Sequence, residues 1–434
     1  MDRFSSRYPF YLSCLLNPAS EITREAAKCV ACGLCLPHCP TYTLLRDEAE
    51  SPRGRLALML ALARNNLPPS AKLELHLSRC LGCRACEKVC PSNVGYGMAL
   101  DAARALLGSR RATDAETTNR AVMLVQWLAE KPARMRILGK FLRLYQWSGL
   151  QWLLRKSRLL RIVGLSGLDG AIPKLAPAKN FTGISPARGK AKARITLFTG
   201  CQADMADGPV LAASIRLLTR LGYEVQIPSG QGCCGALHLH DGQMAKATKL
   251  MRRNLDAFVD GDNTILSVSS GCAAMLCEYE KYMDNETAKK FSGRVMDISQ
   301  FLASLDWPEN IAFEPLPRRI AVHNPCTLTH VLRQEENPHK LLKRIPGAEI
   351  IPLPENNVCC GAAGTYHMTQ APIAEQLRAP KIGHLQRLAP DFLVTSNSGC
   401  ATFLAAGLRE AGLTIEIMHP IVLLEKQLQV ASSK

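Results

Sequence analysis

The sequence predicts a multidomain α+β protein, in which a mostly helical N-terminal domain precedes two repeated α/β domains. Three observations support this fold class. Eight cysteines form two tight quartets within the first 90 residues, where leucines have helical spacing and strand signals are absent. A Cys-Cys-Gly trio begins at Cys233 and recurs at Cys359. Around both trios, short β-branched runs alternate with helical stretches, which is typical of α/β units with a mostly parallel sheet.

The composition is that of a globular protein with an unusual cysteine content. The chain has 434 residues, of which 47% are apolar, 21% are charged and 18 are cysteines. Secreted disulfide scaffolds are usually short, whereas these cysteines gather at metal-ligand spacings and the N-terminus lacks a small-residue cleavage site. No apolar run approaches the ~20 residues of a membrane-spanning helix. We therefore expect a cytoplasmic protein without a transmembrane segment.

Four consecutive parts are expected. Residues 1–108 contain both quartets, and a Ser-Pro start at Ser51 predicts a helix between them. Residues 109–192 form a basic connecting segment without cysteine. Residues 193–315 and 316–434 form the first and second α/β repeats.

Each quartet follows the pattern C-x2-C-x2-C-x3-C-P. The first comprises Cys29, Cys32, Cys35 and Cys39, and the second comprises Cys80, Cys83, Cys86 and Cys90. This run is typical of bacterial ferredoxins that bind cubane [4Fe–4S] clusters. Structural zinc is the alternative, but zinc sites use two spaced pairs of ligands. The quartets therefore predict a ferredoxin-like domain with two [4Fe–4S] clusters.

The fourth cysteine of each quartet is expected to serve the other cluster, as in two-cluster ferredoxins. Cys90 would then complete the site of the first quartet, and Cys39 that of the second. Two clusters held this way would lie within electron-tunnelling distance and form an electron conduit. Arg53 and Arg55 either offset the negative charge of the thiolate-ligated clusters or begin an ordinary solvated helix.

The two α/β repeats are recognised by the register of their cysteines. Cys201 and Cys326 are 125 residues apart, the two Cys-Cys pairs are 126 apart, and Cys272 and Cys400 are 128 apart. The cysteines fall just after the β-branched runs, at the expected carboxyl edge of a parallel sheet, where α/β folds build their sites.

Adjacent cysteines are poorly suited to a disulfide with each other, because that bond would be strained. Gly235 and Gly361 would let the backbone bend so that neighbouring thiolates reach one cluster. Free buried cysteines are the alternative, and Cys277 is expected to be one. The possible additional iron–sulfur ligands are Cys201, Cys233, Cys234, Cys272, Cys326, Cys359, Cys360 and Cys400.

Several stretches resemble the iron–sulfur subunits of bacterial glycolate oxidases: "CVACGLCLPHCPTYTLLRDEAESPRGR", "RCLGCRACEKVCPSNVGYG", "GCCGALHLH", "NPCTLTH" and "CCGAAGTYHMT". Heterodisulfide reductase and anaerobic glycerol-3-phosphate dehydrogenase subunits form the wider family. The resemblance implies an electron-transfer subunit of a glycolate dehydrogenase complex. An FAD-containing partner subunit would oxidise glycolate, and often D-lactate, to the 2-keto acid. Electrons would then pass toward a membrane acceptor such as quinone.

The sequence departs from the heterodisulfide reductase pattern, which ends each Cys-Cys-Gly motif with C-x2-C and builds noncubane clusters. Here Cys277 follows Cys272 at a longer gap, and Cys400 has no near partner. Alternatives are a D-lactate or glycerol-3-phosphate dehydrogenase subunit, a thiol–disulfide catalyst and a regulatory iron–sulfur protein. No dinucleotide-binding loop and no P-loop is recognised, so substrate oxidation is expected in the partner and no catalytic residue is assigned in this chain.

The net charge of +16 is concentrated in the connecting segment, since residues 101–195 contain 19 Lys and Arg but 5 Asp and Glu. Nucleic-acid binding is not expected from so uneven a distribution.

Residues 134–165 place cations on one helical face and apolar side chains on another, close to three tryptophans. This pattern suits a helix in a membrane interface, a pair of domain-packing helices or a docking site for an acidic flavoprotein. We expect peripheral association with the inner membrane. The cations are Arg136, Lys140 and Arg143, the apolar residues are Leu138, Phe141 and Tyr145, and the tryptophans are Trp127, Trp147 and Trp152.

Overall fold

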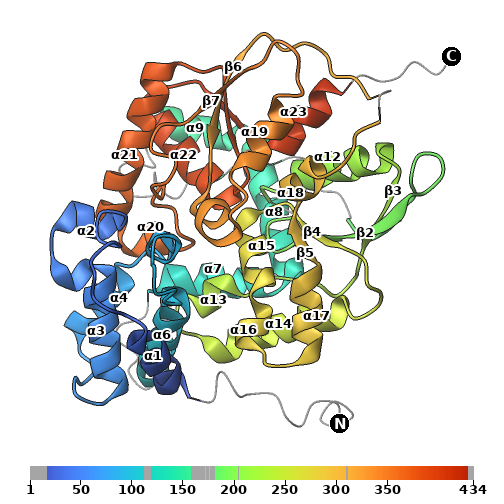
Figure 1. Ribbon diagram of the computed structural model, residues 1–434. Helices are drawn as coiled ribbons and strands as arrows, with labels where there is room; N and C mark the ends of the chain where they lie inside the picture. The colour runs from blue at the N-terminus through green and yellow to red at the C-terminus, as the bar shows by residue number, and fades with distance from the viewer. Residues whose placement is uncertain are drawn as a thin grey trace.

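The computed structural model describes residues 17–111, 119–157, 172, 175, 181–203, 205–308 and 311–428. Figure 1 shows the N-terminal helices in blue beside two α/β units, the first in green and yellow and the second in orange and red. Every cysteine in these residues is a free thiol. The predicted class, a helical ferredoxin-like domain followed by two repeated α/β domains, is confirmed.

The regular elements of the N-terminal domain are all helices in its described residues, and loops between them carry the cysteines. Its helix α3 begins where the Ser-Pro signal predicts, because the Ser51 hydroxyl caps it by accepting a hydrogen bond from the Gly54 N–H at 2.9 Å. Ile22, Met59 and Leu100 lie at the centre of the core that joins these helices. The elements are α1 (Pro18–Ala27), α2 (Pro40–Leu45), η1 (Glu48–Glu50), α3 (Pro52–Ala63), α4 (Ala71–Ser78), α5 (Ala85–Lys88) and α6 (Tyr96–Arg111).

Three connecting helices follow, namely α7 (Arg120–Glu130), α8 (Pro132–Trp147) and α9 (Leu150–Lys156). Residues 158–165 of the predicted basic amphipathic stretch lie outside the described residues.

The first repeat contains a five-stranded sheet in the order β1-β3-β2-β4-β5, parallel except for β1. Its strands are β1 (Gly183–Ser185), β2 (Ala193–Phe198), β3 (Tyr223–Ile227), β4 (Ile265–Ser267) and β5 (Val295–Asp297). Its helices are α12 (Gly208–Arg220), α13 (Ala236–Leu239), α14 (Met244–Ala257), α15 (Ser270–Cys277), α16 (Tyr279–Tyr282), α17 (Glu286–Arg294) and α18 (Ile298–Ala303).

The second repeat has a fully parallel four-stranded sheet in the order β7-β6-β8-β9. Its strands are β6 (Arg319–His323), β7 (Glu349–Pro352), β8 (Phe392–Thr395) and β9 (Glu416–Met418). Its helical elements are η2 (Thr327–Leu332), α19 (Glu336–Leu342), α20 (Tyr366–Thr369), α21 (Ala371–Leu388), α22 (Ser398–Glu410) and α23 (Pro420–Gln427). The β-branched runs predicted around the two Cys-Cys-Gly trios number six, and they contain β2, β3 and β4 in the first repeat and β6, β7 and β8 in the second.

Three strands were not anticipated from the sequence. β5 and β9 each add three residues to the edge of a sheet, and β1 pairs antiparallel with β3. Strands this short carry too little alternation for a period-two signal. β1 also precedes the boundary predicted at residue 193, and the predicted domain boundaries stay predictions.

The two repeats share a hydrophobic core instead of packing as separate globules. One continuous cluster joins Leu211 and Leu217 of α12 with Leu424 of α23, and Ile298 of α18 with Leu341 of α19. Helices from one repeat therefore cover the other. This packing brings the carboxyl edges of the sheets together, where the Ser270 N–H donates to the Ser396 carbonyl at 3.0 Å.

Candidate iron–sulfur sites

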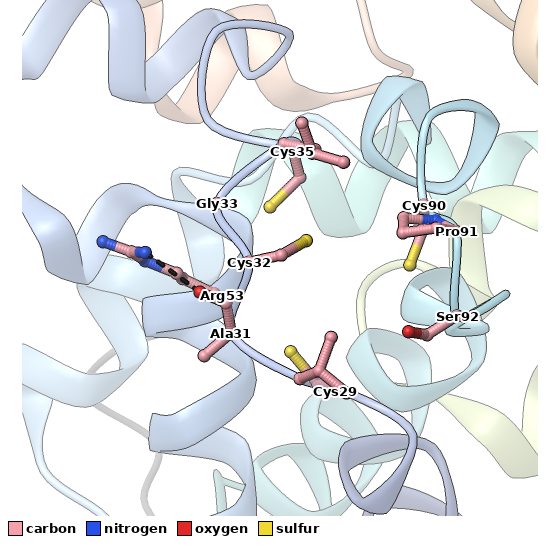
Figure 2. Close-up of a pocket in the computed structure, with 11 residues that line it drawn as sticks. Cys29, Ala31, Cys32, Gly33, Cys35, Arg53, Cys90, Pro91 and Ser92 are labelled. Atoms are coloured by element: carbon pink, nitrogen blue, oxygen red, sulfur yellow. Dashed lines mark hydrogen bonds between the residues drawn. The ribbon is translucent and has the colours of Figure 1, made fainter.

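The first cysteine loop surrounds a hollow of about 320 Å³ between α1 and α2. Figure 2 shows Cys29, Cys32 and Cys35 projecting into it from one loop and Cys90 from a second. The fourth thiol of the first quartet, Cys39, lies elsewhere. The three cysteines of one run thus meet the last cysteine of the other.

The second hollow has the complementary arrangement. Cys80, Cys83 and Cys86 line it together with Cys39, and its empty volume is also about 320 Å³. Burial raises the pKa of the Cys83 and Cys86 thiols well above the usual value. Four thiols with no disulfide among them are the donor set of a [4Fe–4S] cluster, so both hollows fit that group.

Both quartet loops bend by the same backbone device. Ala31 and Gly33 have φ values of 53° and 81°, and the corresponding Gly82 and Arg84 have values of 62° and 61°. These left-handed residues turn the chain between consecutive cysteines. A Cβ at Gly33 would lie 3.2 Å from the Arg53 guanidinium, a close contact that the arginine side chain would have to relieve.

Arg55 is fully buried behind the second hollow. Its guanidinium donates to the Glu50 carboxylate and lies 4.0 Å from the Cys39 sulfur, and Nε donates to the His76 carbonyl at 2.8 Å. Burial alone would lower the pKa of Arg55, but the Cys80 and Cys39 sulfurs, together with Glu50, raise it. A fixed positive charge therefore faces the thiols, and the alternative of a solvated helix start does not apply to Arg55.

Cys201, Cys233, Cys234 and Cys272 come together in the first repeat. Cys201 follows β2, the adjacent pair lies between β3 and α13, and Cys272 is in the first turn of α15. Side-chain hydrogen bonds link them in the order Cys201, Cys233, Cys234, Cys272. Their hydrogen bonds to Cys233, followed by burial, raise the pKa of Cys201 and Cys234, whereas the same hydrogen bonds lower that of Cys233.

The second repeat assembles its four thiols in the same order. Hydrogen bonds link Cys326 to Cys359, Cys359 to Cys360, and Cys360 to Cys400. Cys359, Cys360 and Cys400 are buried. Because four thiols meet in each repeat with no disulfide among them, both sites fit an iron–sulfur group.

Each Cys-Cys-Gly glycine has a defined role. Gly235 and Gly361 both have φ of 91°, and their N–H groups donate to the sulfurs of Cys233 and Cys359 at 3.4 and 3.5 Å. The positive φ lets the chain reverse after the second cysteine, so that the two adjacent thiols reach one site.

The second hollow adjoins the second repeat's site. Cys326 contributes to the raised pKa of Cys83, of which burial is the largest cause. The Tyr366 hydroxyl, six residues after Cys360, donates to the Arg79 carbonyl at 3.0 Å. Two neighbouring thiol sites thus come from segments more than 200 residues apart.

The sites of the two repeats face each other across the shared interface. The Thr327 hydroxyl donates to the Ser270 hydroxyl at 3.0 Å, next to Cys326 and two residues from Cys272. Asp207 of the first repeat hydrogen bonds to the Ser398 side chain of the second, and burial raises its pKa to about 7.

One described cysteine stands apart from these sites. The Cys277 thiol donates to the Val295 carbonyl at 3.7 Å, and burial raises its pKa to about 12. It is a half-buried thiol with a backbone partner. Cys14 lies outside the described residues.

One polar neighbour of the second repeat's thiols was missed from the sequence. His323 lies beside Cys360 and Cys400, and burial lowers its pKa to about 3. The sequence signal that could have revealed it is its position. His323 lies three residues before Cys326, as Phe198 lies three residues before Cys201 in the first repeat.

The connecting helices expose a broad apolar surface, here called the α7–α9 face. Trp147 is 86% exposed and Phe141 67% exposed, and the surface continues through Ile137, Leu144 and Trp152. The predicted apolar row was Leu138, Phe141 and Tyr145. The exposed row on α8 differs from it, because Leu138 and Tyr145 are partly buried. Within the described residues, no helix is both long and apolar enough to cross a bilayer.

Family models match three parts of the chain. A 4Fe-4S dicluster domain matches residues 25–94, and a cysteine-rich domain matches residues 195–277 and again 320–405. The linker region of glycolate oxidase iron–sulfur subunits matches residues 119–169. These matches support several iron–sulfur clusters in one chain.

Curated relatives cover most of the chain. The probable glycolate oxidase iron–sulfur subunit of Bacillus subtilis is 34% identical over 403 residues, 90% of each chain. The glycolate oxidase iron–sulfur subunit of Escherichia coli is 33% identical over 418 residues, 92% of this chain and 94% of that one. Lactate utilization protein A of Geobacillus thermodenitrificans is 32% identical over 231 residues, 52% of this chain and 96% of its own. This chain therefore belongs to the family of glycolate oxidase iron–sulfur subunits.

Proposed function

We propose that this chain is the electron-transfer subunit of a glycolate-oxidising complex. An FAD-containing partner subunit would oxidise glycolate to glyoxylate, and this chain would carry the electrons toward a membrane acceptor such as quinone. The observation that carries the proposal is the clustering of sixteen cysteines into four neighbouring thiol sites. Iron–sulfur clusters, when bound, supply one-electron chemistry at such sites.

Each N-terminal hollow is proposed to hold one [4Fe–4S] cluster. The ligands of the first are Cys29, Cys32, Cys35 and Cys90, and those of the second are Cys39, Cys80, Cys83 and Cys86. This ligand exchange would tie the two sites together through the short segments that carry Cys39 and Cys90. At the second hollow, the chain's own contribution is to shield the Cys83 and Cys86 thiols and to place the positive charge of Arg55 behind them.

Each Cys-Cys-Gly site is proposed to hold a further iron–sulfur group. Its ligands in the first repeat are Cys201, Cys233, Cys234 and Cys272, and in the second repeat Cys326, Cys359, Cys360 and Cys400. The backbone N–H groups of Gly235 and Gly361 would donate to ligating sulfur, an interaction that tunes cluster potentials.

The four sites form a series within the molecule. Each quartet site takes its fourth cysteine from the other quartet. The second hollow adjoins the thiols of the second repeat, and those thiols face the first repeat. A series of neighbouring redox sites suits electron transfer over a distance better than catalysis at one centre.

D-Lactate is the second candidate substrate of the complex. Similarity to lactate utilization protein A over 52% of this chain favours it. Because oxidation would take place in the partner, the choice between the two acids would be made there.

The substrate proposal is tested by anaerobic co-purification with the flavoprotein, followed by acceptor reduction with glycolate, D-lactate and glycerol-3-phosphate. We expect glycolate to be the preferred donor. Failure of glycolate to reduce the acceptor would contradict the leading proposal, and disulfide reduction by the isolated chain would favour a thiol–disulfide catalyst.

We further propose that the α7–α9 face attaches the chain to the anionic cytoplasmic surface of the inner membrane. Its exposed tryptophans and Phe141 stand among cations, and Lys156 lies 4.8 Å from the centre of the Trp152 ring. Aromatic and cationic side chains together suit a membrane interface.

Flotation with liposomes rich in anionic lipid tests this attachment. The triple variant Phe141→Ala, Trp147→Ala, Trp152→Ala should lose most of the floated fraction, while Val259→Ser, at an exposed apolar residue outside this face, should keep it. Equal flotation of the two variants would contradict membrane binding by this face and leave partner docking.

A further inference from the structure

The two repeats carry different residues at one equivalent position beside their thiols. Phe198 ends β2 and His323 ends β6, each three residues before the first cysteine of its site. The strand register confirms the equivalence, because Phe198 pairs with Ser267 on β4 and His323 pairs with Thr395 on β8. Both are almost completely buried, at 1% and 2% exposure.

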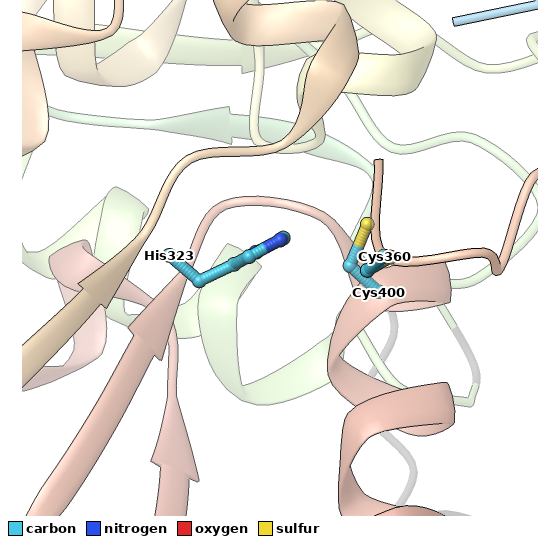
Figure 3. Close-up of side chains that lie close together, drawn as sticks. All are labelled: His323, Cys360 and Cys400. Atoms are coloured by element: carbon cyan, nitrogen blue, oxygen red, sulfur yellow. The ribbon is translucent and has the colours of Figure 1, made fainter. Parts of the chain in front are cut away.

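His323 points from the strand end toward two of the proposed ligands. Its ring nitrogen and the sulfurs of Cys360 and Cys400 lie within 4.8 Å of one another, and Figure 3 shows the imidazole directed at these thiols. Three donors this close can bind one metal ion or neighbouring irons of one cluster. In the first repeat, Phe198 places an apolar ring at the equivalent position.

The other ring nitrogen is already engaged. Nδ1 of His323 lies 2.9 Å from Oγ1 of Thr395, which is hydrogen-bond distance. In the tautomer where Nδ1 donates to this hydroxyl, Nε2 is left with a lone pair for a metal. Metal-ligating histidines usually have such a partner on the second nitrogen, which fixes the ring orientation.

We infer that His323 is a nitrogen ligand of the iron–sulfur group in the second repeat, an inference that rests on the proposed presence of that group. The site then has five protein donors, His323 together with Cys326, Cys359, Cys360 and Cys400. The first repeat has only its four cysteines among these positions.

The ligand difference gives the two repeats different redox properties. Both sites have four thiolates, and a neutral imidazole gives the second site a further donor without the negative charge that a fifth thiolate would add. Lys381 adds to this asymmetry, because it is buried near the second repeat's thiols at the position that Asn254 occupies in the first. The second repeat therefore holds its electron at the higher potential.

Nitrogen coupling in the electron paramagnetic resonance of the reduced full-length protein tests the ligand. Wild-type protein with ¹⁵N-labelled histidine should show the coupling of a directly bound imidazole nitrogen. His323→Phe, which copies the first repeat, should lose that coupling and change the potential of one group. His339→Gln, at a buried histidine of α19, should keep both.

His323→Cys is a second test variant, used in case His323→Phe does not fold. It should lose nitrogen coupling but keep the iron content, because it restores a donor at the same place. Retention of the N-terminal cluster signals in each variant reports that the chain is folded.

Three results would overturn the inference, and they are distinguishable. An iron content of only about eight atoms per chain is enough for two [4Fe–4S] clusters. It would contradict the proposed groups of both repeats, and with them the ligand role of His323. Zinc that is lost in His323→Phe would make the site a zinc site. Iron above eight with unchanged spectra in His323→Phe would remove the ligand alone and leave the proposed function standing.

Discussion

The two Cys-Cys-Gly repeats present the same four thiols on the same strand–helix framework, but in different surroundings. The first site has Phe198 and Asn254 beside its thiols, and the second has His323 and Lys381. The second site adjoins an N-terminal hollow, through Cys83 and Cys326. Duplication thus preserved the backbone geometry that gathers the thiols, while the flanking side chains diverged. Because flanking charge and ligand type set the properties of an iron–sulfur group, the repeats are not interchangeable.

The largest expected difference comes from removing one thiol in each repeat. Cys234→Ser and Cys360→Ser should each lose the iron of their own repeat and keep that of the other, because serine is a poor ligand for iron–sulfur clusters. Iron analysis and low-temperature spectra of the anaerobic proteins measure this.

Interrupted electron flow should separate those same variants. Cys360→Ser removes the site that adjoins the N-terminal domain, so it should slow electron transfer out of that domain, whereas Cys234→Ser should leave transfer between that domain and the second repeat intact. Loss of iron from both repeats in either variant would instead mean that the two sites form a single metal centre.

Alanine substitution should destabilise the protein unequally at Gly235 and Gly361, although both residues have φ of 91°. A Cβ at Gly361 would lie 2.5 Å from the Ala374 carbonyl oxygen, whereas at Gly235 it would lie 3.3 Å from that of Ala247. Backbone strain costs either alanine variant about 1–3 kcal/mol. Gly361→Ala should cost more, because backbone must also move.

Denaturant unfolding measures this difference, with Gly412→Ala as a control for positive φ without a close neighbour. An equal loss for all three variants would show that the backbone conformation, and not the contact, sets the cost.

The helix that follows the last strand of each sheet is capped by a titratable residue, and the two should give opposite pH dependences. Asp297 accepts from the Ser299 N–H, and His419 accepts from the Ile421 N–H. Burial raises the pKa of Asp297 to about 6 and lowers that of His419 to about 4.

The sign follows from which state binds more protons. Between about pH 4 and 6 the native state keeps the Asp297 proton that the unfolded state releases, so this residue makes stability fall as pH rises. His419 is neutral in the native state and protonated in the unfolded state below about pH 6.5, so it makes stability rise with pH.

Unfolding free energies at pH 5 and pH 7 measure these contributions. Asp297→Asn should steepen the gain in stability from pH 5 to 7 and His419→Gln should reduce it, each by roughly 1–2 kcal/mol, since one pKa unit is worth about 1.4 kcal/mol. A change of the same sign in both variants would contradict this account.

The smallest effect is expected at the surface contact between the repeats. Arg216 of α12 donates to Glu425 of α23 at 2.6 Å, and the arginine side chain is partly exposed. An exposed ion pair contributes about 0–1 kcal/mol. Glu425→Gln should therefore lower the unfolding free energy by less than Ile421→Ala, which cuts into the shared core.

Salt dependence distinguishes the two contributions to that interface. The effect of Glu425→Gln should shrink at high ionic strength because salt screens exposed charges, whereas that of Ile421→Ala should not. A large, salt-independent loss in Glu425→Gln would mean that this ion pair holds the repeats together.

Local sequence signals predicted much of the fold, because they depend on residues close together in the chain. The Ser51 cap, the six β-branched runs and the Cys-Cys-Gly turns each correspond to an element of the structure. β5 and β9 escaped prediction because three residues carry no usable periodicity, whereas β4, which is equally short, was recognised from its apolar run. His323 escaped because a lone histidine at a strand end gains meaning only beside Cys360 and Cys400.

By itself, the sequence determined the cysteine spacings, the duplication and the family, since all three are properties of residue order. Only the tertiary structure decided which sites are neighbours. The hydrogen bond from Tyr366 to the Arg79 carbonyl and the core shared by α12 and α23 join segments more than 200 residues apart. Those contacts depend on how the helices and sheets pack, and packing is fixed by the whole buried surface, whereas ligand spacing is fixed by a few consecutive residues.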